Sequence, residues 1–216
     1  AVSYADKNEA QKVLTTLSGE AEVLSFEKTA KKTQPDQLYK LTDIQVEAGS
    51  KYGYTPEKTL ELIQSLYERH KLISYPRTDG RYVSTEKSKD FARLLKAVEA
   101  MPSLSAAVKT VTPEAIAAAQ GNKRFVNDVE VQKSSHDALI PTGDTAALGN
   151  LTMDEMHICE MIFKRFLAIF FPPLEEEKTK AVLTDNNIKF SCTGSKVVNP
   201  GFTVLTSKPK ETPLPE

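Results

Sequence analysis

Apolar positions recur every three or four residues through most of the chain, which is the spacing of one face of an α-helix. At the start of the chain, Asp6 and Glu9 form a capping-box pattern, and Gly19 stands where a C-terminal cap belongs. Further blocks in the middle of the chain carry their own start and stop signals. We predict helices over 36–53, over 55–70, over 91–98, from Thr112 onward, and over 152–171.

Near both ends of the chain the pattern changes to the composition and alternation typical of strands. The expected strands are 21–30, 178–184, 188–192 and 202–206. Asp185, Asn186 and Asn187 supply turn chemistry between the second and third of these strands. The stretch 121–150 contains Gly, Asn, Asp and Pro and is predicted to be an ordered loop region.

This order of elements predicts an α+β chain with more than one domain. We expect a mainly helical domain over 36–174, inserted into a small antiparallel β domain made of 1–35 and 175–208. Residues 209–216 are expected to be a tail or linker. Two helices joined by a short turn and followed by a β-like segment make the helical domain winged-helix-like.

Composition limits the class of protein. About 40% of the 216 residues are hydrophobic and 26% are charged, which is enough apolar material for a core and excludes wholesale disorder. The 28 Lys and Arg residues against 29 Asp and Glu residues exclude a uniformly basic protein, although a local basic site is possible. The pattern offers no membrane span or signal peptide, and two cysteines give no zinc spacing and no disulfide framework, so we expect a cytoplasmic protein.

The segment 72–82 carries the most distinctive chemistry. Pro76 biases Tyr75 toward an extended conformation, and Arg77 follows on the same side of an extended chain. A phenol is a poor nucleophile at neutral pH, but a neighbouring guanidinium favours the phenolate and binds phosphate through two donors. From these residues alone, a surface turn with a half-buried tyrosine is the better interpretation, because most Tyr-Pro-Arg triplets carry no function.

Several motifs in a fixed order resemble the type IA DNA topoisomerases, and most closely their topoisomerase III branch. Leu66–Glu68 followed by Ile73–Asp79 resembles the active-site signature of that family. Ser135–Thr142 is similar to its His-x-Ala-Ile-x-Pro-Thr motif. The remaining matches are residues of 41–59 in the preceding helices, and Phe190, Gly194 and Pro200–Phe202 in the returning strands.

The resemblance implies a mechanism and a set of site residues. Tyr75 would attack a phosphodiester of single-stranded DNA and become linked to the 5′ phosphate, Arg77 would position the phosphate, and His136 would contact the phosphate or assist proton transfer. Another DNA strand passes through the break before the 3′ hydroxyl reverses the reaction. The residues expected to contact DNA are Arg69, Lys71, Thr78 and Arg81.

Other polar residues leave two interpretations open. Gly80 stands where the family usually has a small polar residue, which would add flexibility, and Asp137 either orients His136 or points away from it. His70 and Tyr82 could touch DNA, although a solvated helix end and packing under the loop are the simpler expectations. For His157 we expect a core or capping role, and Lys164 and Arg165 either bind DNA or offset the helix dipole.

The resemblance also implies partners outside this sequence. The family's acidic, metal-binding domain and its remaining gate domain are not recognisable here, so we expect Mg²⁺ to act in the full-length enzyme through ligands outside this chain. The chain alone is expected to be monomeric and inactive in relaxation, and it lacks an initial Met, as a piece of a longer protein would. The resemblance implies single-stranded DNA and negatively supercoiled or catenated DNA as substrates, and a nucleoid-associated location in the cytoplasm.

Two other classes of protein compete with this interpretation. A non-enzymatic winged-helix DNA-binding module would need a basic recognition helix, and the helix expected over 55–70 is not strongly basic. A tyrosine recombinase or a relaxase would need several Arg and His groups, or a His metal cluster, in patterns that this sequence does not show.

Overall fold

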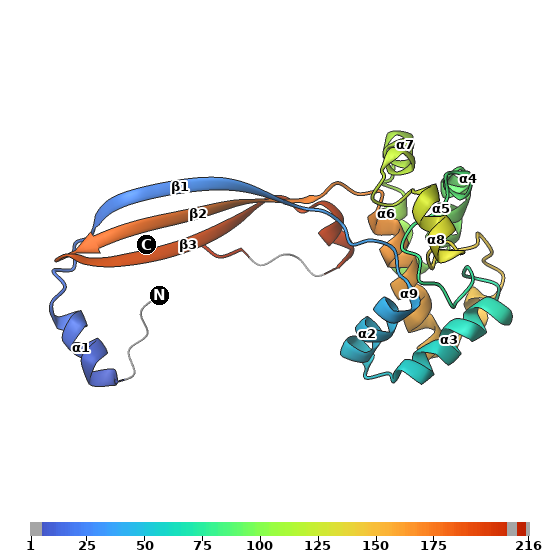
Figure 1. Cartoon of the computed structure of the whole chain (residues 1–216), viewed down its shortest axis with the longest axis horizontal. Coiled ribbons are helices and arrows are strands. Elements are labelled where there is room, and N and C mark those ends of the chain that lie inside the picture. Colours follow the sequence, from blue (N-terminus) through green and yellow to red (C-terminus); the bar gives the residue numbers. More distant parts are fainter. Residues whose placement is uncertain (1–5, 207–210, 215–216) are drawn as a thin grey trace. The chain divides into compact units, whose positions relative to one another are not determined.

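The computed structural model describes residues 6–206 and 211–214 and divides the chain into two compact units (Figure 1). The first unit is made of Ala1–Gln34 together with Pro173–Glu216, and the second of Pro35–Pro172. The first contains an antiparallel sheet and the second is helical, so the α+β class is confirmed. The winged-helix likeness stays a prediction. None of the helices in the described part of the chain has the length and apolar composition needed to cross a bilayer.

The sheet of the first unit has the strand order β1-β2-β3. Its strands are β1 (Glu22–Thr33), β2 (Leu174–Asp185) and β3 (Ile188–Asn199), and helix α1 (Lys7–Thr15) precedes them. Strands β2 and β3 form a hairpin whose turn residues Asn186 and Asn187 both have positive φ, as the turn prediction requires. The buried Asp185 carboxylate accepts hydrogen bonds from the Ser18 backbone N–H and hydroxyl, and so ties the hairpin to the segment that enters β1.

The second unit is built from helices connected by short ordered segments. These helices are α2 (Leu41–Tyr52), α3 (Pro56–Glu68), α4 (Thr85–Ser88), α5 (Phe91–Glu99), α6 (Pro102–Val108), α7 (Pro113–Gly121), α8 (Asp128–Ser134) and α9 (Met153–Ala168), with a 3₁₀ turn η1 (Leu148–Asn150) before α9. Helix α9 contacts both α3 and α5 (Figure 1). Its side chain Phe166 is fully buried and lies edge-on to Phe91 and Phe170, with ring centroids 5.6 and 5.2 Å away.

Local sequence signals explain where the helices of the second unit begin. Pro56 occupies the first turn of α3, and the Thr55 hydroxyl accepts a hydrogen bond from the Lys58 N–H. Helix α9 begins with a complete capping box, in which Thr152 and Glu155 each satisfy the backbone N–H of the other. These caps fix where α3 and α9 begin, and the segment with the most distinctive chemistry follows α3.

Four local predictions are wrong. The candidate strand 202–206 is a 3₁₀ turn, η2 (Gly201–Leu205), because the chain bends at Pro200 and the Thr203 N–H reaches the Pro200 carbonyl. The loop expected over 121–150 contains α8, since Asn127 acts as a helix cap rather than a turn residue. Helix α6 lies where no element was expected. Helix α1 ends at Thr15, before the expected cap at Gly19.

The prediction of a free tail also needs correction where the structure describes it. Ser195 of β3 and Thr212 exchange backbone hydrogen bonds of 2.8 and 3.0 Å. Gly194 allows this contact, because a Cβ there would lie 3.0 Å from the Thr212 carbonyl oxygen and 3.0 Å from the Leu214 side chain. The rest of the expected tail, 209–210 and 215–216, lies outside the described residues.

Candidate active site

Two segments that lie far apart in the sequence run together in the helical unit. The segment that follows α3 pairs with residues 136–142 through a β-bridge between Ile73 and Pro141. On either side of this bridge, the Ser74 N–H donates to the Ile140 carbonyl at 2.9 Å, and the Thr142 N–H donates to the Leu72 carbonyl at 3.0 Å. The pairing joins the two motifs that the sequence analysis singled out.

Tyr75 and His136 meet at the end of this pairing. Their ring centroids are 4.4 Å apart with a tilt of 40°, and the Tyr67 ring contacts Tyr75 edge-on from the other side at 5.7 Å. The Tyr75 side chain is 39% exposed, and His136 is exposed as well. Two of the predicted catalytic residues therefore lie side by side at the surface.

Ser74 is the residue of this site that sequence reasoning missed. Its hydroxyl donates to the Ala138 carbonyl at 2.8 Å and accepts from the Ile140 N–H at 3.0 Å. A serine before a tyrosine is too common a pair to stand out in a single sequence, so only the contacts identify it.

The predicted cations divide into two groups. Arg69, Lys71 and Arg77 are exposed, and Lys71 holds its ammonium 5.7 Å above the Tyr67 ring. Arg81 instead forms a two-pronged pair with Asp43, with bonds of 2.7 and 2.6 Å that raise the pKa of the guanidinium. Among the residues that the structure describes, no carboxylate is bonded to the cations of the first group, whereas the charge of Arg81 is matched by Asp43.

The loop after Tyr75 is held by a hydrogen bond between its own residues and by close packing against the segment of His136. Thr78 is 2% exposed, and its hydroxyl accepts a hydrogen bond from the Gly80 N–H at 2.9 Å, so its predicted contact with DNA is not available in this conformation. Gly80 is required by close packing rather than by flexibility, because a Cβ would lie 2.6 Å from the His136 carbonyl oxygen. The Asp137 carboxylate accepts a hydrogen bond from the Ser84 N–H at 2.7 Å, at the start of α4.

His70 is not at a solvated helix end, so that prediction is wrong. Its Nε2 lies 3.1 Å from the carboxylate of Glu155, and only 10% of its side chain is exposed. Glu155 also accepts hydrogen bonds from the Ser65 hydroxyl and from Thr152. Burial alone would raise the pKa of Glu155, but these hydrogen bonds outweigh it and lower the pKa to about 2.

The remaining candidates have structural partners. His157 stacks on Tyr52 with centroids 4.2 Å apart, and its Nδ1 lies 2.8 Å from the Tyr54 hydroxyl. Arg165 donates to Glu47 and to the Tyr39 hydroxyl, and Lys164 pairs with Glu160 of the same helix at 3.2 Å. The contacts of His157 and Arg165 tie α9 to its neighbours, whereas the Lys164 pair lies within α9.

Comparison with known proteins identifies the family. The model of the DNA topoisomerase family matches residues 1–216, the whole chain. This chain belongs to the type IA DNA topoisomerases. The DNA topoisomerase 3 of Bacillus licheniformis is 37% identical over 182 residues, and that of Bacillus subtilis is 34% identical over 201 residues.

The topoisomerase chain covers only part of its relatives. These alignments take in 84% and 93% of the chain but 24% and 27% of the two relatives, so the chain spans about a quarter of their length. The structure of full-length topoisomerase I from Thermotoga maritima has a TM-score of 0.69 and 22% identity, with 99% of this chain and 34% of that one covered. This likeness shows that the fold is shared.

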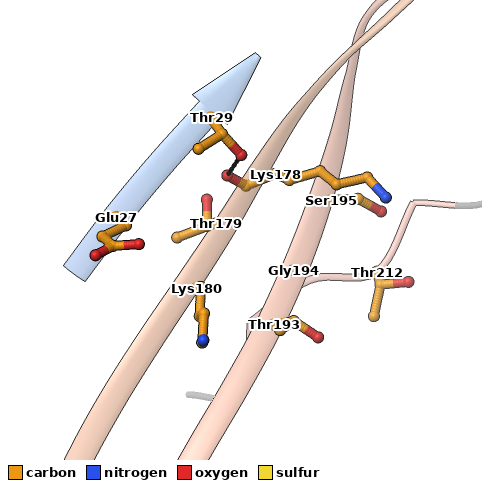
Figure 2. Close-up of a pocket in the computed structure, with 9 residues that line it drawn as sticks. All are labelled: Glu27, Thr29, Lys178, Thr179, Lys180, Thr193, Gly194, Ser195 and Thr212. Carbon is orange, nitrogen blue, oxygen red and sulfur yellow. Dashed lines mark hydrogen bonds between the residues drawn. The ribbon is translucent and has the colours of Figure 1, made fainter. Parts of the chain in front are cut away.

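Two hollows on the surface of the topoisomerase chain are lined by charged side chains. One of about 390 Å³ opens beside Gly80, where Lys40 and Lys133 face Asp79 and Glu130. A second of about 520 Å³ lies on the sheet, where Lys178 and Lys180 of β2 stand among hydroxyl side chains of the neighbouring strands (Figure 2). Charges of both signs line each hollow, and neither contains Tyr75 or His136.

A metal centre is not formed by the part of the topoisomerase chain that the structure describes. Within residues 6–206 and 211–214, no group of three or more His, Cys, Asp or Glu side chains could hold a metal ion. The residues present therefore do not fit the Mg²⁺ expected for the full-length enzyme, and no chemical step is assigned to that ion.

Proposed function

We propose that this chain is the part of a type IA topoisomerase that carries the nucleophile for cleavage of single-stranded DNA, and that Tyr75 is that nucleophile. The observation that carries the proposal is the exposed Tyr75 ring lying 4.4 Å from the ring of His136, at the junction of the two family motifs. Family membership supports the class of reaction, and the contact between the two rings supports the assignment of residues.

The proposed reaction exchanges one phosphodiester for another. The Tyr75 oxygen attacks phosphorus and loses its proton, a bond forms between the phenolic oxygen and phosphorus, and the bond from phosphorus to the 3′ oxygen breaks. The departing 3′ oxygen takes up a proton and becomes a hydroxyl. After strand passage, that hydroxyl loses its proton and its oxygen attacks the phosphorus of the 5′ phosphotyrosine. The bond from phosphorus to the 3′ oxygen forms again, the bond to the tyrosine oxygen breaks, and the tyrosine oxygen takes up a proton. No oxidant, reductant or nucleotide is consumed.

Arg77 and His136 assist the proposed cleavage from two different segments of the chain. Arg77 lies two residues beyond Tyr75 and is exposed, so its planar guanidinium can hold two phosphate oxygens and stabilise their developing charge. His136 contacts the Tyr75 ring directly and is placed to bind the same phosphate or to move the phenolic proton. Arg69, Lys71 and the exposed part of Arg81 supply further contacts with the backbone of the strand.

The wider assignment extends to parts of the parent enzyme outside this chain. We propose that Mg²⁺ binds to an acidic domain of the parent protein, that the β unit is the hinge of the parent, and that the chain by itself is monomeric. Supercoiled or catenated DNA in the cytoplasm would be the substrate. Because the chain covers about a quarter of its relatives, we expect no relaxation of plasmid DNA by the 216-residue chain alone.

Covalent adduct formation in the parent enzyme tests the nucleophile. Tyr75→Phe should abolish the adduct with single-stranded DNA while the strand still binds, because binding rests on phosphate and stacking contacts elsewhere. Tyr52→Phe is the matched control, since it also removes one phenolic oxygen but from the stack on His157, and it should keep the adduct. An adduct formed by Tyr75→Phe would show that another residue is the nucleophile.

The helpers should give graded effects in the same assay. Arg77→Ala should slow cleavage by removing a charge-assisted hydrogen bond, for which a loss of about 1.5–3 kcal/mol is a reasonable scale. Arg77→Lys should recover only part of the rate, because the planar fork is lost. His136→Ala should also slow cleavage. A phosphate joined to tyrosine through the 3′ end of the DNA would point instead to the chemistry of a tyrosine recombinase.

A further inference from the structure

Ser74 connects the two strands that carry the proposed catalytic residues. It directly precedes Tyr75, and both partners of its hydroxyl, the Ala138 carbonyl and the Ile140 N–H, lie a few residues after His136. The Ser74 N–H adds a third bond to the same segment through the Ile140 carbonyl. Ser74 thus bonds to the segment of His136 through both its side chain and its backbone.

The partners of the Ser74 hydroxyl are shielded from water. Ala138 and Ile140 are both 0% exposed. A buried backbone group that loses its partner costs free energy, and a water molecule cannot easily replace the hydroxyl at a closed site. Removing the hydroxyl therefore favours a separation of the two segments, which would let solvent reach these groups and would move His136 away from Tyr75.

We propose that Ser74 is a positioning residue for DNA cleavage, and that its hydroxyl sets the distance between the Tyr75 nucleophile and His136. This inference rests on the proposed function of Tyr75. Ser74 itself need not touch DNA, because its hydroxyl is already bonded on both sides to the protein. Its effect should therefore appear in the rate of cleavage and not in the affinity for the strand.

The contact between the two rings gives a direct test in the 216-residue chain. Ring centroids 4.4 Å apart should give a clear nuclear Overhauser signal between Tyr75 and His136. Ser74→Ala should weaken that signal several-fold, and Ser74→Thr, which retains a hydroxyl, should preserve it. Ser88→Ala is the matched control, because the Ser88 hydroxyl is also largely buried but bonds within its own helical turn, to Thr85.

Cleavage by the parent enzyme gives the second test. Ser74→Ala should lower the rate of adduct formation at saturating DNA by about ten- to hundredfold, the scale expected for a misplaced reacting group, with KM unchanged. Ser74→Thr should restore the rate. Should Ser74→Ala fail to fold, Ser74→Cys keeps the shape with a weaker donor and should be intermediate in both measurements.

The outcomes separate this inference from the proposed function. A wild-type ring signal and a wild-type rate in folded Ser74→Ala or Ser74→Cys would overturn the positioning role, even with Tyr75 as the nucleophile. A fall in affinity equal to the fall in rate would overturn it too, since Ser74 would then act on binding. An adduct in Tyr75→Phe would refute the proposed function by itself, whatever the Ser74 variants do to the ring signal.

Discussion

The buried carboxylate of Glu155 offers a sharp test of what holds the helical unit together. Glu155 belongs to the first turn of α9, and only 7% of its side chain is exposed. One carboxylate oxygen accepts from the Ser65 hydroxyl at 2.6 Å and lies 3.1 Å from His70 Nε2. The other accepts from the Thr152 N–H and hydroxyl, each at 2.9 Å. We consider Glu155→Gln, which keeps the shape of the side chain and removes its charge.

The pKa of Glu155 sets the size of the expected effect. A fall from the ordinary value of 4.5 to about 2 means that folding favours the ionised form. At about 1.36 kcal/mol for each pH unit, this preference amounts to roughly 3 kcal/mol at neutral pH. The amide of Gln also turns an NH₂ donor toward one of the existing donors. Glu155→Gln should therefore lower the free energy of unfolding of the helical unit by about 3 kcal/mol.

Urea unfolding of the 216-residue chain, followed by circular dichroism at 222 nm, measures this loss. The signal reports mainly the helical unit, and a separate transition of the β unit must be fitted independently. Glu160→Gln is the matched control on the same helix. It breaks a half-exposed pair with Lys164 at 3.2 Å, and such pairs contribute at most about 1 kcal/mol.

The contribution of Glu155 to stability should also depend on pH, in a direction that its pKa fixes. Because the folded pKa of Glu155 is depressed, its contribution is complete above about pH 4.5 and is lost as the pH falls toward about 2. The difference in stability between the wild type and Glu155→Gln should shrink over that range. A loss below about 1 kcal/mol at pH 7, or a loss that does not change between pH 5 and pH 2, would refute a stabilising role for the ionised carboxylate.

Two further substitutions test packing in the helical unit. Gly80→Ala should lower the free energy of unfolding by about 1–3 kcal/mol in urea, because the new methyl group meets the His136 carbonyl oxygen at 2.6 Å; a neutral result would show that this turn yields easily. Phe166→Ala should cost about 3–5 kcal/mol in the same measurement, since it removes one ring of the cluster that Phe166 forms with Phe91 and Phe170, and a cost near 1 kcal/mol would mean that the cluster collapses to fill the cavity.

Helix boundaries were predictable where a capping side chain and an apolar stripe occur together. Thr55 with Pro56 and Thr152 with Glu155 are such signals, and the structure begins α3 and α9 at those residues. The turn at Asn186 and Asn187 was also predictable. Both residues have a positive φ, and asparagine is one of the few residues other than glycine that tolerate it. In each case the determining contacts are local in sequence, so a single sequence contains them.

Predictions failed where distant residues decide the environment. His70 looks like a polar helix end, and only Glu155, 85 residues further along, shows that it is nearly buried. Ser74 gains its role from Ala138 and Ile140 in the same way. The sequence indicates flexibility at Gly80, but in the structure the nearby His136 carbonyl leaves no room for a Cβ at this position. Periodicity and turn chemistry contain no information about such pairings.

The pairing of β1 with β2 has a consequence for the order of folding. The Lys28 ammonium donates to the Glu177 carboxylate across these strands, although the two residues are 149 positions apart in the sequence. Closing a flexible loop of that length costs on the order of 4 kcal/mol in chain entropy before any strand contact forms. A folded helical unit removes most of that cost by bringing Thr33 and Leu174 together. On a ribosome, β1 would therefore stay unpaired until the whole helical unit and β2 had been synthesised, so we expect the sheet to close after the helical unit has folded.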